Sequence, residues 1–377
     1  VSERKGLQEP EYSPFLDVDY PQRVLWGDTH LHTAMSTDAG MIGNRLGLEE
    51  AYQFALGKTV VSSTGVRARL QRPLDFLVVA DHAENLGLAP MIEERNPDLL
   101  KLDFGKQIAQ LVYDGNYGDA YTLWGEGMTA RQDPLAGQDA LTRTMWERIT
   151  AAAEQFNAPG QFTALIGFEW TSSPGGNNLH RNVIFRDGKD EADQVLPFSN
   201  YDSAEPEDLW AWMQAYEDKT GGRMLAIAHN GNLSNGLMFD DRTRSGKRLD
   251  RDYAERRMRW EPVYEVTQMK GDGEAHPSLS PNDEFADYGT WDKGSFGPEP
   301  KTPDMLPKEY ARSAWKRGLA YDAKLGANPF KFGVVGSTDS HTGLSTAAEN
   351  NFFGKVSLVE PTADPIRFEE AITGRFT

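Results

Sequence analysis

Short runs of apolar residues recur along the chain, and several of them end in a histidine or a carboxylate. Residues 75–82 read Asp-Phe-Leu-Val-Val-Ala-Asp-His. A continuous apolar run of this length is typical of a strand buried on both faces of a parallel sheet. Similar runs predict strands at residues 23–33, 162–170, 180–185, 223–229, 262–268, 332–341 and 355–359.

Helical spacing of apolar residues separates many of these runs. Residues 46–56 and 139–156 carry apolar side chains three and four positions apart, as on the buried stripe of a helix. The order strand, helix, strand favours a parallel α/β architecture. Further helices are predicted at residues 209–220, 241–259, 310–325 and 366–372.

Two long segments interrupt this alternation. Residues 86–160 have the pattern of a mostly helical insertion. Residues 271–308 are rich in Gly, Pro, Asp and Ser, which predicts a long loop of the kind that often covers a functional site. Residues 1–22 are polar and contain three prolines, so we expect an extended N-terminal arm. We expect residues 23–377 to form a single domain whose specificity is shaped by the insertion and the loop.

The composition excludes several classes of protein. Hydrophobic residues make up 39% and charged residues 25% of the chain, as in an ordinary globular protein. The net charge of −18 argues against a nucleic-acid binder, whose affinity comes from neutralising phosphates. No apolar run reaches the ~20 residues that span a bilayer, so no membrane contact is expected. The absence of cysteine rules out disulfides, cysteine-ligated zinc and a cysteine nucleophile.

The acidic balance does not exclude a small anionic substrate, because bound metal ions can reverse the local field. The first residue is Val1 rather than Met, which either a removed signal peptide or a chain cut from a longer one would explain. A periplasmic or secreted location is therefore slightly favoured over the cytoplasm. The oligomeric state is not predicted.

Six of the seven histidines lie at the edges of predicted strands and close to carboxylates. His30 and His32 alternate, so on a strand they face the same side. In α/β barrels, functional side chains gather at the carboxyl ends of the strands. Imidazole and carboxylate are common ligands of Zn, Mn and Fe. The pattern predicts a metal site built from His30, His32, Asp38, His82, Glu169, His180, His229, Asp339 and His341.

These motifs resemble the polymerase and histidinol phosphatase (PHP) superfamily over most of the chain. The longer stretches at residues 80–87 and 164–172 are similar to a subfamily labelled by the domain name DUF3604. The motifs are Gly27-Asp-Thr-His-Leu-His32 with Asp38, Ala80-Asp-His82, Gly167-Phe-Glu169, Ala228-His229-Asn230 and Ser337-Thr-Asp-Ser-His341.

The resemblance implies a distorted (β/α)7 barrel, similar to a TIM barrel, with the insertion and long loops over its C-terminal face. It also implies two or three divalent metal ions, of Mn, Zn or Fe. By analogy, one ion would be held by His30, His32, Glu169 and Asp339. Glu169 would bridge to a second ion bound by His180 and His229, and a third would be bound by Asp38, His82 and His341. Family members often have histidine at the position of Asp38.

The expected activity is that of a multinuclear metal-dependent hydrolase, a phosphoesterase acting on a small-molecule monoester or diester. Two ions ~3.5–4 Å apart can hold a bridging hydroxide as nucleophile and neutralise a phosphoryl oxygen. No serine or cysteine nucleophile is then needed. Two alternatives stay open. The same metals could hydrolyse an amide, lactone or carboxyl ester, or the barrel could bind a metal or ligand without catalysis.

Further residues near the motifs are candidates for direct contact with the substrate. Asp81 could orient the imidazole of His82, or it could simply accept a hydrogen bond at the end of its strand. His276 is the one histidine outside the motifs and could protonate a leaving group. The candidates are Asp81, His276 and Lys270 for catalysis and Arg181, Glu84 and Asn85 for substrate binding. For Lys270 and Arg181, a plain surface charge is the favoured interpretation, and phosphate binding is the alternative.

Overall fold

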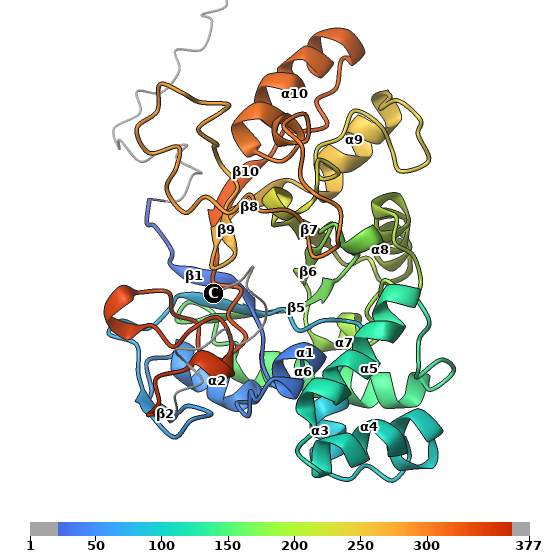
Figure 1. The fold of residues 1–377 in the computed structure, drawn as a ribbon, viewed down its shortest axis with the longest axis vertical. Helices are drawn as coiled ribbons and strands as arrows, with labels where there is room; N and C mark the ends of the chain where they lie inside the picture. Colours follow the sequence, from blue (N-terminus) through green and yellow to red (C-terminus); the bar gives the residue numbers. More distant parts are fainter. Residues whose placement is uncertain (1–21, 364–377) are drawn as a thin grey trace, which may run out of the picture.

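A single curled sheet forms the centre of the molecule (Figure 1). The computed structural model describes residues 22–363, so most of the predicted N-terminal arm and the predicted helix at 366–372 lie outside the described residues. A separate two-stranded hairpin joins β2 (Val60–Val61) and β3 (Arg67–Ala68). The sheet follows the order β1 (Gly27–Leu31), β4 (Phe76–Val79), β5 (Thr163–Trp170), β6 (Arg181–Phe185), β7 (Met224–Ala228), β8 (Val263–Gln268) and β10 (Gly333–Gly336), with β9 (Gly271–Asp272) paired to β8.

The sheet is mixed, so the expected (β/α)7 barrel is wrong. β6 runs antiparallel to both β5 and β7, whereas the other neighbouring strands of the main path pair in parallel. Residues 171–180 join β5 to β6 without an α-helix. Parallel strands need a crossover of a dozen or more residues, so this connection is too short. An apolar run does not encode strand direction, and the sequence pattern therefore missed the reversal.

The two edges of the curled sheet are joined by backbone hydrogen bonds beyond the end of β10. The amide of His32 donates to the carbonyl of Ser340 at 2.9 Å, and the amide of Asp339 donates to the carbonyl of His30 at 2.8 Å. This contact brings residues from opposite ends of the sequence to one place.

Ten α-helices surround the sheet in the described part of the chain. Of the four helices in the 86–160 insertion, α3 to α5 gather at the lower right of Figure 1, and α9 and α10 lie at the top. The helices are α1 (Thr37–Met41), α2 (Leu48–Ala55), α3 (Leu88–Glu93), α4 (Asp103–Tyr113), α5 (Tyr117–Ala130), α6 (Asp139–Phe156), α7 (Lys189–Ala192), α8 (Pro206–Thr220), α9 (Arg251–Trp260) and α10 (Ala311–Leu325).

Two local predictions differ from the structure. The expected strand at 355–359 is a single bridge at Val356 followed by a short 3-10 turn, Ser357–Val359. The expected helix at 241–259 begins only at Arg251, where the side chain of Asp250 accepts a hydrogen bond from the amide of Tyr253. Such a cap sets the start of a helix, and the basic residues before it lie in a turn region.

The two faces of the sheet bury different sets of residues. One face packs against α2, α6 and α8 through large side chains such as Phe168, Phe185 and Trp146. The opposite, concave face has a small apolar layer that includes Val78, Ile184 and Ile227. Side chains alternate along a strand, so residues two or four positions away point to the same face. His82, His180 and His229 stand at such positions relative to Val78, Ile184 and Ile227. The predicted metal ligands therefore stand above this apolar layer.

Candidate metal centre

Four predicted ligands converge at the edge of the concave face. The Nε2 atoms of His30 and His32 lie 3.1 Å apart. Glu169 Oε2 lies 3.3 Å from the first nitrogen and 3.1 Å from the second. Asp339 Oδ1 lies 3.4 and 3.3 Å from the same two nitrogens. All four side chains are buried, so water does not screen the electrostatic repulsion between their lone pairs and charges.

The second nitrogen of each of these imidazoles is already hydrogen-bonded. His30 Nδ1 donates to Glu265, whose oxygens lie 3.0 and 3.2 Å away, and His32 Nδ1 lies 2.9 Å from Ser36 Oγ. A carboxylate can only accept, so the proton of a neutral His30 sits on Nδ1. Its Nε2 then presents a lone pair to the carboxylates of Glu169 and Asp339, as in the carboxylate–histidine arrangement of metal sites.

The donor set fits a divalent cation. Each of the two imidazole nitrogens lies 3.1–3.4 Å from the other and from one oxygen of each carboxylate. An ion with tetrahedral bonds of ~2.1 Å has ligand–ligand edges of about 3.4 Å. Acceptor atoms that converge at such distances repel one another unless a proton or a cation lies between them. Nitrogen and oxygen ligands of this kind suit Zn, Mn or Fe.

Without a cation, protons must balance these charges. Burial lowers the pKa of His30, but Asp339, Glu265 and Glu169 together raise it to about 10. Burial raises the pKa of the Glu169 carboxyl, but the surrounding imidazoles, His82 first, hold it well below its usual range. The carboxylate of Glu169 therefore stays ionised and supplies the charge that a divalent ion needs.

Glu169 connects two groups of ligands through its two oxygens. Oε2 faces His30 and His32, whereas Oε1 lies 2.7 Å from His180 Nδ1 and 3.0 Å from His229 Nε2. Burial lowers the pKa of His180 to about 3 and also lowers that of His229. Both rings are therefore neutral, which is the form that binds metals, and the carboxylate is placed to bridge two ions.

The antiparallel direction of β6 explains the position of His180. This histidine stands directly before the first residue of β6, whereas Glu169 lies near the end of β5 and His229 follows β7. Since β6 runs opposite to its neighbours, its beginning lies at the same edge of the sheet as their ends. The reversal that excludes a regular barrel is thus what brings His180 to the cluster.

A third group centres on Asp38, in the first turn of α1. Asp38 Oδ2 lies 2.9 Å from His341 Nε2 and 3.2 Å from His82 Nε2. His32 completes a set whose ligand atoms all lie within 4.8 Å of one another. Burial raises the pKa of the Asp38 carboxyl, but His341 and His82 hold it well below its usual range. A carboxylate at this position therefore completes a possible cation site.

Two lysines flank the ligand carboxylate of Asp339. Lys355 Nζ lies 2.6 Å from Asp339 Oδ1 and 2.8 Å from His341 Nδ1, and Lys270 pairs with Asp339 Oδ2. Burial lowers the pKa of Lys355 to about 8. Burial also lowers that of Lys270, but Asp339 and Glu169 more than compensate and raise it. Lys270, predicted as a catalytic residue, is thus brought to the cluster.

Asp81 and Glu84 lie close to the cluster but bind the backbone around it. Asp81 accepts hydrogen bonds from the amide and the hydroxyl of Thr33, at 2.6 and 2.8 Å, which matches the strand-end alternative. Glu84 is buried and accepts from the amides of Thr171 and Asn200, at 3.2 and 2.6 Å. Burial raises the pKa of both carboxyls. These contacts indicate that both residues shape the loops that carry ligands.

Three other predicted residues are held elsewhere. Arg181 forms a buried ion pair with Glu261, with a distance of 3.0 Å between Nε and Oε1. Asn85 accepts hydrogen bonds from Trp124 Nε1 and Tyr201 Oη at 3.1 and 2.8 Å, which ties the helical insertion to the sheet. His276 Nε2 lies 2.9 Å from Asp292 in the long loop. Their described contacts serve packing of these segments and not the cluster.

Two residues of the centre were not identified from the sequence. Glu265 orients His30, and the signal for it was a carboxylate in the middle of an apolar strand, in phase with Val263 on the concave side. Lys355 had no such signal, because it lies in an irregular segment after β10. Only the folding of this segment back against the sheet brings its ammonium group to Asp339.

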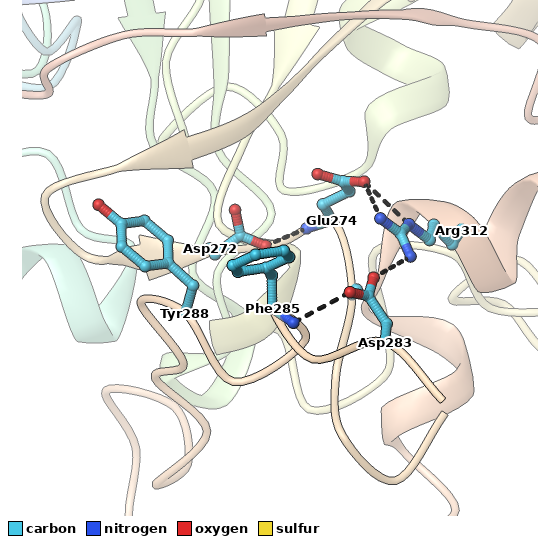
Figure 2. A pocket seen from close by; sticks show the side chains of 7 residues that line it. Asp272, Glu274, Asp283, Phe285, Tyr288 and Arg312 are labelled. Atoms are coloured by element: carbon cyan, nitrogen blue, oxygen red, sulfur yellow. Dashed lines mark hydrogen bonds and ion pairs between the residues drawn. The ribbon is translucent and has the colours of Figure 1, made fainter. Parts of the chain in front are cut away.

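An open cavity is lined by residues of β9, of the loop that follows it and of α10, and by none of the candidate ligands (Figure 2). It has a volume of about 310 Å³ and is lined by Asp272, Glu274, Asp283, Phe285, Tyr288, Ala275 and Arg312. The positively charged residue of this lining, Arg312, is already paired with Glu274 at 2.6 Å and with Asp283 at 2.5 Å. None of the residues that line the cavity is a histidine, so the cavity lacks the imidazole ligands that the buried cluster offers.

A family model described as "Protein of unknown function (DUF3604)" matches residues 19–377. The chain belongs to the DUF3604 family. The match includes every residue of the ligand cluster. No curated protein and no solved structure gives a significant match to the chain. In the part of this DUF3604 protein that the structure describes, every helix is too short or too polar to cross a membrane.

Proposed function

We propose that this DUF3604 protein is a metal-dependent phosphoesterase that acts on a small molecule. The observation that carries the proposal is the convergence of six histidines and three carboxylates at one edge of the sheet. The ligand atoms fall into three groups, namely His30, His32 and Asp339; His30, Glu169 and His229; and His32, Asp38, His82 and His341, with His180 in contact with Glu169.

The charge of the cluster favours an anionic substrate. Four carboxylates contact its imidazoles or lysines, those of Asp38, Glu169, Glu265 and Asp339. Together with Lys270 and Lys355 they leave a net charge of −2. Two divalent ions would reverse this charge to +2. A phosphoester would neutralise it, whereas an amide or a lactone carries no charge of its own.

Bound divalent ions would supply a Lewis acid and would lower the pKa of a coordinated water to about 7. The residues of the chain hold the rest of the arrangement in place. Glu265 and Ser36 fix the rings of His30 and His32. Gln268 Nε2 donates to Asn230 Oδ1 at 2.7 Å and also contacts Asp339. Lys270 and Lys355 hold ammonium groups beside Asp339, where they would stabilise negative charge on a phosphoryl group.

Relationship to the PHP superfamily is part of the proposal. The order of the ligands along the chain, from His30 and His32 through His82, Glu169 and His229 to Asp339, supports it. The mixed sheet does not follow a regular (β/α)7 plan, so the proposal rests on the ligands alone.

Chelation and restoration of metal test the proposal. Purified protein is stripped with a chelator and then supplied with Mn, Zn or Fe, and phosphoesterase activity is measured on monoesters and diesters. Activity is expected to vanish and return, and His30→Ala and Asp339→Asn are expected to abolish it. Glu94→Gln is a matched control, since Glu94 pairs with Arg148 on the surface. Full activity in His30→Ala would contradict the proposal.

Matched substrates separate phosphoester hydrolysis from other reactions at the same metals. Phenyl phosphate and phenyl acetate release the same leaving group, phenol. A difference in their rates of hydrolysis therefore shows whether the site acts on a phosphoryl or an acyl group. Turnover of phenyl phosphate alone is expected. Turnover of phenyl acetate alone would reassign the site to carboxyl esters, and bound metal without any turnover would favour a binding protein.

A further inference from the structure

The loop between β9 and α10 places an aromatic ring beside the ligand cluster. The ring centroid of Phe296 lies 6.4 Å from that of His180, with 24° between the planes, and Lys270 Nζ lies 5.9 Å from the Phe296 centroid. Phe296 is 42% exposed, whereas Ser295 before it and Gly297 after it are buried. An apolar surface is thus presented to solvent next to a strongly polar site.

Contacts on both sides of Phe296 hold this ring in place. Its amide donates to the carbonyl of Gly176 at 2.9 Å. A Cβ atom at Gly176 would lie 2.2 Å from the amide nitrogen of Gly297, so the two segments meet at a distance that only glycine allows. Farther along, Lys301 Nζ lies 2.6 Å from Glu309 and 2.7 Å from the carbonyl of Asn232.

The Lys301–Glu309 pair is almost fully buried, with side chains 8% and 0% exposed. Breaking such a pair leaves an uncompensated charge, so this anchor is not released easily. The loop therefore presents Phe296 in a defined position, and a ligand meets a preformed apolar wall rather than a segment that must first be ordered.

We infer that Phe296 makes the site selective for phosphoesters whose organic group carries an aromatic ring; this inference rests on the proposed function. A phosphoryl group beside Lys270 and His180 directs the rest of the substrate past the Phe296 ring. A phenylalanine ring offers no hydrogen bond to the hydroxyls of a sugar or polyol. It does stack with another aromatic ring at centroid distances of 4.5–7 Å, with a gain beyond simple burial.

Benzyl phosphate and ethyl phosphate provide the test. In both, water forms a new bond to phosphorus, the ester P–O bond breaks, and the proton from water ends on a departing alcohol. The alcohols have similar acidity, so the two esters differ mainly in the ring. Wild-type protein is expected to prefer benzyl phosphate. Phe296→Ala is expected to lower kcat/KM for benzyl phosphate roughly tenfold and to change that for ethyl phosphate by less than about twofold.

Two further variants control for folding and for general loss of an aromatic residue. Phe296→Tyr keeps the ring and is expected to keep the preference. Phe285→Ala removes an even more exposed phenylalanine, 72% exposed, from the same loop. Phe285 lines the separate acidic cavity (Figure 2), so its removal is expected to leave the preference unchanged.

Binding of phosphonates separates this inference from the proposed function. Benzylphosphonate and ethylphosphonate cannot be hydrolysed at a P–O ester bond, and calorimetry with metal-loaded protein gives their affinities. If wild-type protein hydrolyses neither ester, the proposed function fails, but a preference for benzylphosphonate that Phe296→Ala removes would still support the inference. The inference is overturned if wild-type protein shows no preference in binding, or if Phe296→Ala weakens both ligands equally.

Discussion

Two buried charged clusters in this protein balance their charges in different ways. Around Glu261, each acceptor meets a donor from the chain: Arg181 Nε and Trp210 Nε1 lie 3.0 and 3.1 Å from Oε1, and Arg257 Nε lies 3.1 Å from Oε2. Around Glu169, five imidazoles face the carboxylate, and other carboxylates stand beside them. The first cluster is complete as folded, whereas the second needs a cation or protons.

This difference separates a structural ion cluster from a functional one. Buried charges are tolerated when their partners and hydrogen bonds are supplied within the fold. Convergent acceptors without enough donors raise the energy of the protein, and a chain that keeps them is expected to use them for binding. Both clusters are buried and both contain charged groups, so the balance of donors and acceptors is the informative property.

Glu169→Gln gives the largest expected effect. The amide keeps the shape of the side chain but loses the charge that faces both groups of imidazoles. Metal content is expected to fall, and kcat/KM on phosphoesters is expected to drop about a thousandfold or more, since the metals supply several kcal/mol of transition-state stabilisation. Elemental analysis and steady-state kinetics measure both. Unchanged metal content would show that Glu169 does not bridge.

Glu261→Gln tests the other cluster. Two arginines would lose their shared carboxylate in a buried place, and the free energy of unfolding is expected to fall by about 3–5 kcal/mol. Denaturant titration measures this loss. Metal content per folded molecule is expected to remain as in the wild type. If Glu261→Gln lost metal but kept its free energy of unfolding, the cluster around Glu261 would be the metal-binding one, contrary to the proposal.

Glu265→Gln is expected to have an intermediate effect. It removes the charge from the group that accepts the Nδ1 proton of His30 while leaving all nine candidate ligands in place. Partners of this kind typically change metal affinity by 10–100-fold, and competition with a coloured chelator measures that change. An affinity equal to that of the wild type would indicate that Glu265 serves only packing.

The dependence of metal affinity on pH gives the smallest effect. Burial lowers the pKa of His30, but Asp339, Glu265 and Glu169 raise it to about 10, so without metal the ring is protonated below that pH. An incoming ion must displace this proton. Affinity is therefore expected to rise between pH 7 and 8, by up to about tenfold for each proton displaced. Calorimetry in buffers of different ionisation enthalpy measures the released protons.

The alternation of side chains along strands was enough to predict most of the cluster. His30 and His32 share a face because their spacing is two. The other ligands stand near strand ends, except Asp38, which lies in α1. The structure brings all nine predicted ligands together, although the binding of metal itself stays a prediction. Helices such as α6 were predicted with their bounds because amphipathic spacing is also a local property.

Only the tertiary structure decided the direction of β6, the separation of Arg181 and His276 from the cluster, and the contributions of Glu265, Lys355 and Phe296. Strand direction depends on hydrogen bonds between distant segments, and those leave no periodic trace in the sequence. Arg181 is the first residue of β6 and His180 directly precedes it, but consecutive side chains of an extended chain point to opposite faces. One therefore reaches the cluster and the other pairs with Glu261. The sequence thus determined which residues could bind a metal, and the packing of the sheet decided which partners surround them.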